Sequence, residues 1–221
     1  MDDNAVAQYL ADHPDFLLRH PELVAVLEVP DLRQGQAVSL VERQAQIQRE
    51  RIRALEARLA ELLRHGAEND AIADRLARWA RTLLAQSDTL ALPVLLLEEL
   101  KRVFGLPHAA LRVWNVRPLF APLLCARAVG EDTQRLAASM AAPYCGPNTG
   151  FEAAQWLAED GAAAGSVHSL ALLPLRATEG EAPFGLLVLG SADAQRFQAG
   201  MGTAFLERIA SLAAAALSRL R

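Results

Sequence analysis

A seam of mostly apolar residues recurs at helical spacing between Val38 and Leu83. Its members follow one another at alternating steps of three and four residues, without a skipped step. This alternation is the a/d pattern of a coiled coil, in which two helices bury their seams against each other. We therefore expect a helical stalk that pairs two copies of the chain into a homodimer. The positions expected at the dimer seam are Val41, Ala45, Ile52, Leu55, Leu59 and Leu62.

Charged residues beside the seam favour parallel pairing of the two stalks. Arg51 occupies a g position and Glu56 the following e position, which is an attractive pair between parallel helices. A competing interpretation is that the helix folds back onto its own domain, so that the seam is an ordinary amphipathic face. Glutamates alternate with the arginines between Arg43 and Arg64, which is typical of a solvated helix face. Nucleic acid is therefore not an expected partner.

Residues that weaken the seam or begin a helix divide the chain into three parts. Gly66 and Asn69 occupy seam positions, and a glycine inside a helix costs about 1 kcal/mol relative to alanine. We expect the stalk at residues 38–67 and a globular domain at residues 68–221, with residues 70–85 continuing the helix into that domain. Residues 1–37 are expected to form a small helical unit, because His-Pro-Asp at residues 13–15 is echoed by His-Pro-Glu at residues 20–22. A proline followed by an acid is typical of a helix start.

Composition excludes several classes of protein. Hydrophobic residues make up 52% of the chain and charged residues 22%, which predicts a folded core, and the net charge of −4 provides no basic field for nucleic acid. No apolar stretch reaches the roughly 20 residues of a membrane helix. The acidic start of the chain is unlike a secretory signal, so we expect a cytoplasmic protein without a membrane partner. Its two cysteines are then expected to be free thiols.

Residues 92–221 alternate between helical and strand patterns. Helices are expected at 92–104, 131–139, 151–157 and 200–220, and strands at 109–114, 123–128, 167–175 and 184–191. The segment 143–150 is rich in turn residues and is expected to be a loop. Helices before, within and after antiparallel strands predict an α+β fold in which the helices pack mainly on one face of the sheet.

Several segments carry a resemblance to known families. Phe-Gly-Leu-Leu-Val-Leu-Gly-Ser at residues 184–191, with Asp193, Phe197 and the closing helix, resembles the last strand and helix of GAF domains. The paired His-Pro motifs, the segment 38–44, the Tyr-Cys-Gly loop at 144–146 and the Met-Gly-Thr segment at 201–203 together resemble the bacterial DUF484 family. This resemblance implies a GAF-like domain behind an N-terminal helical region, and it implies no activity.

GAF-like domains commonly bind small molecules, and particular ligands leave recognisable residues. The chain lacks the Asn, Lys, Phe and Asp-Glu set of cyclic-nucleotide binders, since Lys101 is its single lysine, and Cys145 precedes glycine rather than the histidine usual at bilin sites. His108 and His168 lie beside strand segments, where a packed or solvent-facing histidine is commoner than a haem ligand. His13 and His20 are separated by a proline that breaks a shared helical face. No cofactor or metal is therefore expected.

Residues 128–166 are too long for a simple strand connection, so this segment is expected to fold over one face of the sheet. Its aromatic and sulfur-containing side chains would line a small-molecule pocket, with Arg112 and Ser191 as polar anchors. The same aromatic side chains could instead form a plug that fills the space, and Asp193 could cap a turn rather than face a ligand. The candidate ligand-binding residues are Arg112, Tyr144, Cys145, Phe151, Trp156, Ser191 and Asp193.

These observations lead to a functional hypothesis and two alternatives. The chain is expected to be a non-enzymatic, dimeric, GAF-like sensory module that binds a small molecule or protein partner and transmits through its stalk. The first alternative is a thiol-dependent GAF-type reductase that uses Cys145, because a turn rich in Gly and Pro exposes backbone N–H groups that can lower a thiol pKa. The second alternative is a structural adaptor without a ligand.

Overall fold

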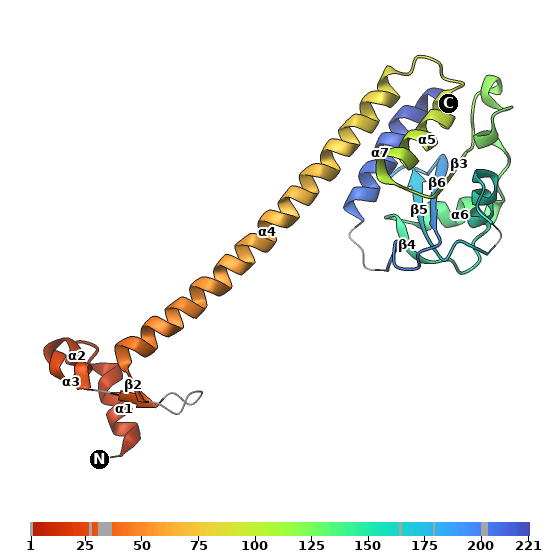
Figure 1. The fold of residues 1–221 in the computed structure, drawn as a ribbon. Coiled ribbons are helices and arrows are strands. Elements are labelled where there is room, and N and C mark those ends of the chain that lie inside the picture. Colours follow the sequence, from red (N-terminus) through yellow and green to blue (C-terminus); the bar gives the residue numbers. More distant parts are fainter. Residues whose placement is uncertain (1, 27, 31–36, 164, 179, 200–202) are drawn as a thin grey trace. The chain divides into compact units, whose positions relative to one another are not determined.

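The protein is described by a computed structural model that covers residues 2–26, 28–30, 37–163, 165–178, 180–199 and 203–221, apart from the side chains of 25, 28–30 and 37–42. The chain divides into two compact units, Met1–Asn69 and Asp70–Arg221. None of the helices in these ranges combines the length and apolar character that a bilayer-spanning segment requires. Figure 1 labels the helices and strands.

The first unit is helical with a small β-ribbon. Its helices are α1 (Asp3–Asp12), α2 (Phe16–Arg19) and α3 (Pro21–Val26), so a helix begins at or just after each copy of the His-Pro echo. The strands β1 (Glu28–Pro30) and β2 (Ala37–Ser39) pair antiparallel. The sequence predicted a small helical unit at residues 1–37 and gave no sign of this ribbon, because three-residue strands are too short to show an alternating pattern.

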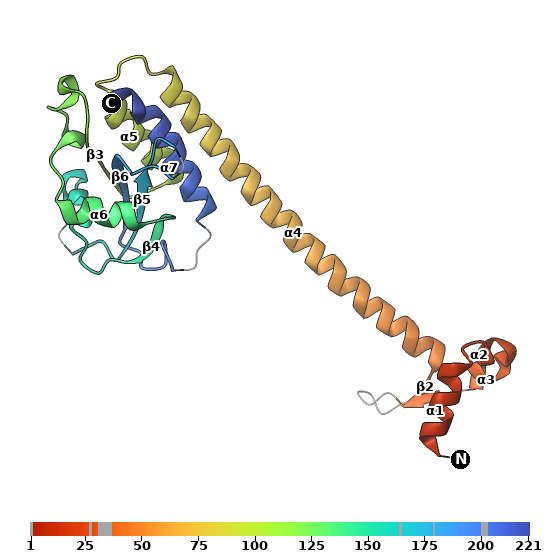
Figure 2. The same ribbon diagram turned by 180° about the vertical axis from the view of Figure 1, so that it is seen from behind.

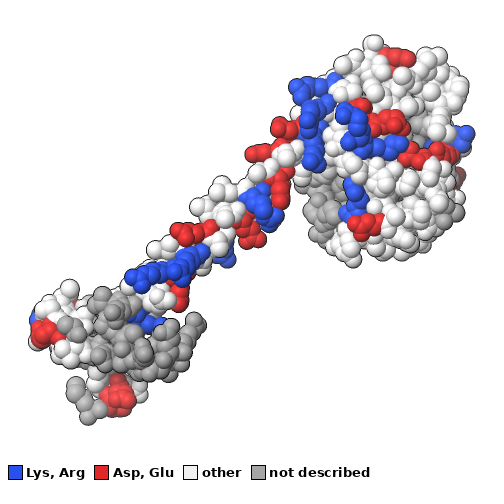
Figure 3. Space-filling view, in the orientation of Figure 1, with Lys and Arg blue, Asp and Glu red and all other residues white. Residues whose placement is uncertain are grey.

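Helix α4 (Leu40–Ala85) is a single helix of 46 residues. It passes through Gly66 without interruption, which agrees with the expected continuation of the helix through residues 70–85. Basic and acidic side chains interleave along it, as Figure 3 shows, which agrees with a solvated face rather than a basic stripe. The side chain of Val41 lies outside the described residues. Ala45 is half-buried, whereas Ile52, Leu55, Leu59 and Leu62 are between 52% and 65% exposed.

The second unit is built on a four-stranded antiparallel sheet with the order β3-β6-β5-β4. Its strands are β3 (His108–Val113), β4 (Tyr144–Pro147), β5 (Ser169–Leu175) and β6 (Gly185–Ser191). Every residue of β5 and β6 is buried, which explains their nearly unbroken apolar sequences. The pairing register places Leu173 opposite Leu187 at the centre of the sheet. Strand β3 forms one edge.

Helices cover both faces of this sheet. On one face, the end of α4 packs with α5 (Leu92–Phe104) and α7 (Ala204–Leu217), and Trp79, Leu96 and Leu217 are fully buried there. Figures 1 and 2 show α5 and α7 side by side on that face, with α6 (Glu131–Ser139) on the other. The α6 face is completed by the 3-10 helix η3 (Glu152–Asp160). The predicted α+β class, an antiparallel sheet flanked by helices, is confirmed.

Local signals explain the best-predicted elements. Pro93 lies in the first turn of α5, and Gly105 ends the helix in the left-handed conformation at φ 60° while its N–H donates to the carbonyl oxygen of Lys101. Three further 3-10 helices, η1 (Pro118–Phe120), η2 (Leu124–Ala126) and η4 (Ser218–Leu220), complete the second unit. The bounds of α5 and α6 agree with the predicted ranges.

Two predictions about the second unit were wrong. The expected strand at residues 123–128 is the 3-10 helix η2, so Cys125 lies on a turn beside the sheet rather than in it. The expected loop at residues 143–150 contains β4, which pairs with β5 at the edge opposite β3. Both errors have one cause. Short apolar runs do not distinguish a strand from a turn, and the pairing partner that decides between them lies elsewhere in the sequence.

Candidate functional site

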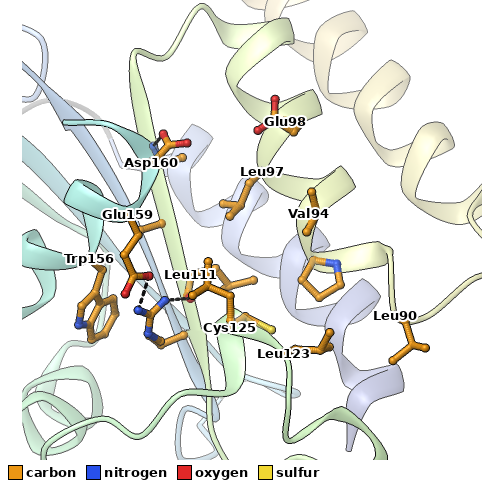
Figure 4. Close-up of a pocket in the computed structure, with 15 residues that line it drawn as sticks. Leu90, Val94, Leu97, Glu98, Leu111, Leu123, Cys125, Trp156, Glu159 and Asp160 are labelled. Carbon is orange, nitrogen blue, oxygen red and sulfur yellow. Dashed lines mark hydrogen bonds and ion pairs between the residues drawn. The ribbon is translucent and has the colours of Figure 1, made fainter.

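A cavity of ≈ 220 Å³ lies beside the edge strand β3. Figure 4 shows it between α5, which contributes Val94 and Leu97, and η3, which contributes Trp156 and Glu159. Residues of β3 and η2 form the rest of the wall. Most of the lining is apolar, and the charged lining residues are Glu98, Arg112, Glu159 and Asp160. An apolar cavity with a few polar groups is the usual form of a small-molecule site.

Arg112 places a buried charge in the wall of this cavity. The residue lies on β3 and is 4% exposed, and its guanidinium carbon is 5.2 Å from the ring centroid of Trp156. One terminal nitrogen donates to the carbonyl oxygen of Leu111 at 3.0 Å, and the other donates to Oε2 of Glu159 at 2.6 Å. A charge that is removed from water to this degree requires such a partner.

Glu159 is shared between two arginines. Its second carboxylate oxygen, Oε1, accepts a hydrogen bond from Arg127 at 2.9 Å. The side chain of Glu159 is 31% exposed, and that of Arg127 is 62% exposed. The hydrogen bond and charge of Arg112, with a smaller contribution from Arg127, hold the pKa of Glu159 below its ordinary value. Glu159 is therefore ionised at neutral pH, and the three side chains together carry one net positive charge.

Asp160 attaches the end of η3 to two neighbouring elements. Its Oδ1 accepts a hydrogen bond from Lys101 of α5 at 2.5 Å, and its Oδ2 accepts one from the backbone N–H of Ala109 in β3 at 3.0 Å. Burial alone would lower the pKa of Lys101, but its bonds to Asp160 and Glu98 raise it overall. The charged end of η3 is therefore linked directly to α5 and to the edge strand.

Only two of the seven candidate ligand-binding residues, Arg112 and Trp156, line this cavity. Tyr144 and Phe151 pack edge to face at 5.2 Å and belong to the cluster between η3, α6 and the sheet. The side chains of that cluster pack against this face of the sheet. A hollow of ≈ 280 Å³ next to Phe151 has no charged residue in its lining. The segment therefore does cover the sheet, and the charged cavity lies at the sheet edge.

Ser191 ends β6, and Asp193 lies in the turn that follows it. The N–H of Asp193 donates to Oγ of Ser191 at 3.0 Å, and the N–H of Gln195 donates to Oδ1 of Asp193 at 2.8 Å. The hydroxyl of Ser169 donates to the carbonyl oxygen of Asp193 at 2.6 Å. Neither residue lines the cavity at β3. Their side chains serve the turn, which was the alternative considered for Asp193.

Both cysteines are buried free thiols. Cys145 lies on β4 within the cluster under α5 and α7, and burial raises the pKa of its thiol. Cys125 lines the cavity, and burial raises its pKa to about 11, although its own backbone hydrogen bond and the charge of Arg112 oppose the rise. No group of three or more His, Cys, Asp or Glu side chains that could hold a metal occurs among the described residues.

The thiols are expected to react slowly with an alkylating reagent. A pKa of about 11 leaves roughly one Cys125 thiol in 10,000 as the nucleophilic thiolate at pH 7. Labelling of the folded protein at pH 7, followed by mass spectrometry, should be at least about tenfold slower than labelling of glutathione, and should accelerate in denaturant. Rapid labelling of Cys145 that does not vary with pH near neutrality would contradict this expectation and favour the reductase alternative.

The most informative residues of the cavity were not candidates in the sequence. Glu159 and Asp160 are an adjacent acid pair before a glycine, which is ordinary for a helix end, and Lys101 lies on an amphipathic helix. Their partners are 47 and 59 residues away in the chain. The one signal in the sequence was that Lys101 is the single lysine of an arginine-rich chain. That signal did not identify Asp160 as its partner.

Comparisons with known proteins agree with the resemblance found in the sequence. A family model described as "Protein of unknown function, DUF484" matches residues 1–221. The protein YigA of Escherichia coli K12, described as uncharacterized, is 32% identical over 99% of this chain and 92% of its own length. The YigA proteins of Salmonella typhimurium and Shigella flexneri are 30% and 31% identical over the same shares.

Among solved structures, similar chains include two GAF domains. One belongs to an Acinetobacter phosphoenolpyruvate-protein phosphotransferase, with 10% identity, a TM-score of 0.44, and coverage of 66% of this chain and 92% of that chain. The other is the phycoerythrobilin-bound GAF domain of a cyanobacterial phytochrome, with 11% identity, a TM-score of 0.45, and coverage of 68% and 96%. Both TM-scores are low, and a likeness at that level says nothing of a shared ligand. The full-length family match and the relatives that align over nearly the whole sequence show that this chain belongs to the DUF484 family.

Proposed function

We propose that the protein is a non-enzymatic regulatory module that binds a small molecule in the cavity beside β3. The observation that carries this proposal is the buried guanidinium of Arg112 in the wall of a largely apolar cavity. Burying a charge is costly, so its presence at a cavity wall, rather than in a packed core, favours a recognition role. The volume of ≈ 220 Å³ suits a ligand smaller than a typical drug molecule.

The absence of an enzymatic role is part of the same proposal. The carboxylates of Glu98, Glu159 and Asp160 all take part in ion pairs, and the thiol of Cys125 has a pKa of about 11. A general base or nucleophile at this site would need a free carboxylate, imidazole or activated thiol. The charged groups of the cavity are better suited to holding and orienting a ligand than to moving protons.

We also propose that two copies pair through α4, as the sequence pattern predicts. Ile52, Leu55, Leu59 and Leu62 expose more than half of their area along one seam of that helix. None of the described side chains of residues 2–69 is buried, so in a single chain this unit has no core among them. A second copy of the seam would cover these four side chains, and the Arg51–Glu56 pairing would set parallel register.

The cavity and α4 are connected through α5. Val94 and Leu97 of α5 line the cavity, while the indole N–H of Trp79 on α4 donates to the carbonyl oxygen of Leu96 at 3.3 Å. Because α4 is one continuous helix from Leu40 to Ala85, a ligand that displaces α5 would bias the position of the whole helix. We propose this as the route by which ligand binding changes the pairing of two stalks.

Native mass spectrometry of freshly purified protein tests the proposal. We expect a small bound mass on the wild-type protein, and we expect Val94→Trp to lose it, because Val94 lines the cavity and an indole there occupies the ligand's space. Leu84→Trp is the matched control, since Leu84 is 82% exposed and does not line the cavity. A bound mass retained by Val94→Trp would place the ligand elsewhere, and no bound mass after incubation with a cell extract would favour the adaptor alternative.

A further inference from the structure

We infer that the ligand of this cavity is a small apolar carboxylic acid whose carboxylate takes the place of Glu159 on Arg112. The inference rests on the proposed ligand-binding function and deepens it by naming the chemical class. Glu159 supplies from within the chain the carboxylate that Arg112 requires. Binding is then an exchange of one carboxylate for another, in which Glu159 keeps its bond to Arg127.

The donor geometry of Arg112 leaves room for an incoming carboxylate. A guanidinium has five N–H donors in a planar fork that matches a carboxylate with two parallel hydrogen bonds. Among the described residues, Arg112 donates one bond to Leu111 and one to Glu159, and the latter engages Oε2 alone. A ligand carboxylate could therefore form the two-bond contact that Glu159 does not make.

Glu159 is placed to leave Arg112 at low cost. Its carboxylate already bonds to Arg127, whose side chain is largely exposed, so the released carboxylate remains paired and hydrated. It is carried by a 3-10 helix, whose hydrogen bonds are weaker than those of an α-helix. Arg112 and Arg127 carry two positive charges, and Glu159 carries one negative charge. A bound anion would therefore neutralise the remaining positive charge of the three side chains.

The remainder of the cavity defines the rest of the ligand. Pro93, Val94, Leu97, Leu111 and Leu123 present hydrocarbon to it, which suits an aliphatic chain or single ring. A volume of ≈ 220 Å³ is below the usual range for drug-sized ligands and suits a short-chain or benzoic-type acid. Asp160 and Glu98 outnumber the Lys101 they share by one charge, so a cation is the competing ligand class, and benzylamine among the probes below tests it.

The replacement of Glu159 by a ligand carboxylate on Arg112 would also affect α5. Glu159 immediately precedes Asp160, whose carboxylate holds Lys101 of α5 and the N–H of Ala109 in β3. Movement of the Glu159 side chain away from Arg112 therefore acts on the residue that fastens η3 to α5. The same ligand carboxylate that gives affinity would thus supply the displacement of α5 on which the proposed transmission depends.

Calorimetric titration of the full chain with matched probes tests the ligand class. We expect benzoate and 4-methylpentanoate to bind, and benzamide, 4-methylpentanamide and benzylamine to bind at least about tenfold more weakly, because charge-assisted bonds to arginine are roughly twice as strong as neutral ones. Arg112→Gln should abolish binding of the acids. Glu159→Gln should tighten it about tenfold, because an amide competes poorly with the ligand for Arg112. Arg135→Gln on α6 is the matched control and should leave binding unchanged.

The outcomes separate the ligand class from the binding function. Equal affinity for acid and amide, stronger binding of benzylamine, or weaker binding of acids by Glu159→Gln would each overturn the carboxylate inference while the cavity remained a binding site. Failure of every probe to bind would also overturn it, and the native mass measurement on Val94→Trp would then decide the proposed function separately. Circular dichroism shows whether Arg112→Gln folds. If it does not, the affinity of Glu159→Gln for the acids decides whether the carboxylate inference holds.

Discussion

Replacing Leu55 and Leu59 together with aspartate is expected to abolish the proposed pairing of two copies through α4. Both residues are 57% exposed on α4 and occupy adjacent positions of the seam. If the seam is buried between two copies, the double variant places four carboxylates in an apolar interface, at a cost of several kcal/mol for each ion. Since 1.4 kcal/mol is a factor of ten, the dimer dissociation constant should rise by a factor of about 1,000 or more.

Sedimentation velocity at micromolar concentration measures this effect directly. The matched control is the double variant Ala54→Asp and Ala57→Asp, which adds the same charges to exposed positions of the same helix outside the seam. The control is expected to remain dimeric, and both proteins should keep the thermal transition of the second unit. A Leu55/Leu59 variant that sediments as a dimer would show that α4 does not hold two copies together, and a monomeric wild type would reject the homodimer itself.

Trp79→Ala is expected to destabilise the second unit by about 3–5 kcal/mol, which is the usual cost of deleting a buried tryptophan side chain. Trp79 is fully buried, packs in the core under α5 and α7, and donates to the carbonyl oxygen of Leu96. Its removal leaves a large cavity and deletes one hydrogen bond to α5. For a domain of this size the loss corresponds to a fall in Tm on the order of 10 °C.

Thermal unfolding followed by circular dichroism provides the measurement. Trp79→Phe keeps an aromatic ring in the core and should lose clearly less stability than the alanine variant. Leu84→Ala on the same helix is the matched control, because Leu84 is 82% exposed and its removal should change stability by less than about 0.5 kcal/mol. If Trp79→Ala resembled Leu84→Ala, the end of α4 could not be part of the domain core, and the proposed route from cavity to stalk would fail.

The amino-acid sequence was sufficient for elements whose signals are local. Pro93 and Gly105 bound α5, and its predicted range of residues 92–104 agrees with the structure. The apolar runs that became β5 and β6 were recognised because strands buried on both faces contain almost no polar residues. The uninterrupted 3-4 alternation predicted a helix that continues from the stalk to residue 85. Helix capping and hydrophobic periodicity depend on residues a few positions apart, so the sequence shows them before the tertiary structure is known.

Only the tertiary structure decided the assignments that depend on distant partners. Residues 123–128 have the composition of a strand but form η2, whereas residues 144–147 resemble a turn but pair with β5. Aromatic side chains in the segment 128–166 were correctly expected over the sheet, and the sequence left open whether they line a pocket or fill the space. In the structure Tyr144 and Phe151 pack against each other and Phe151 also lines a hollow of ≈ 280 Å³, an arrangement that depends on the shapes of all neighbouring side chains at once.

The cavity shows most clearly which features follow from the local sequence and which depend on the tertiary structure. Arg112 and Trp156 were recognisable as chemically suitable residues, but their common site needs α5, β3, η2 and η3 to meet at one sheet edge. Glu159, which pairs with Arg112 across 47 residues, has no distinguishing sequence context. Local sequence thus determined the long helix, the main strands and the caps, because these rest on short-range hydrogen bonding and periodic burial. The tertiary structure alone decided which charged groups meet, because an ion pair between distant segments exists only once the packing of the whole domain has brought them together.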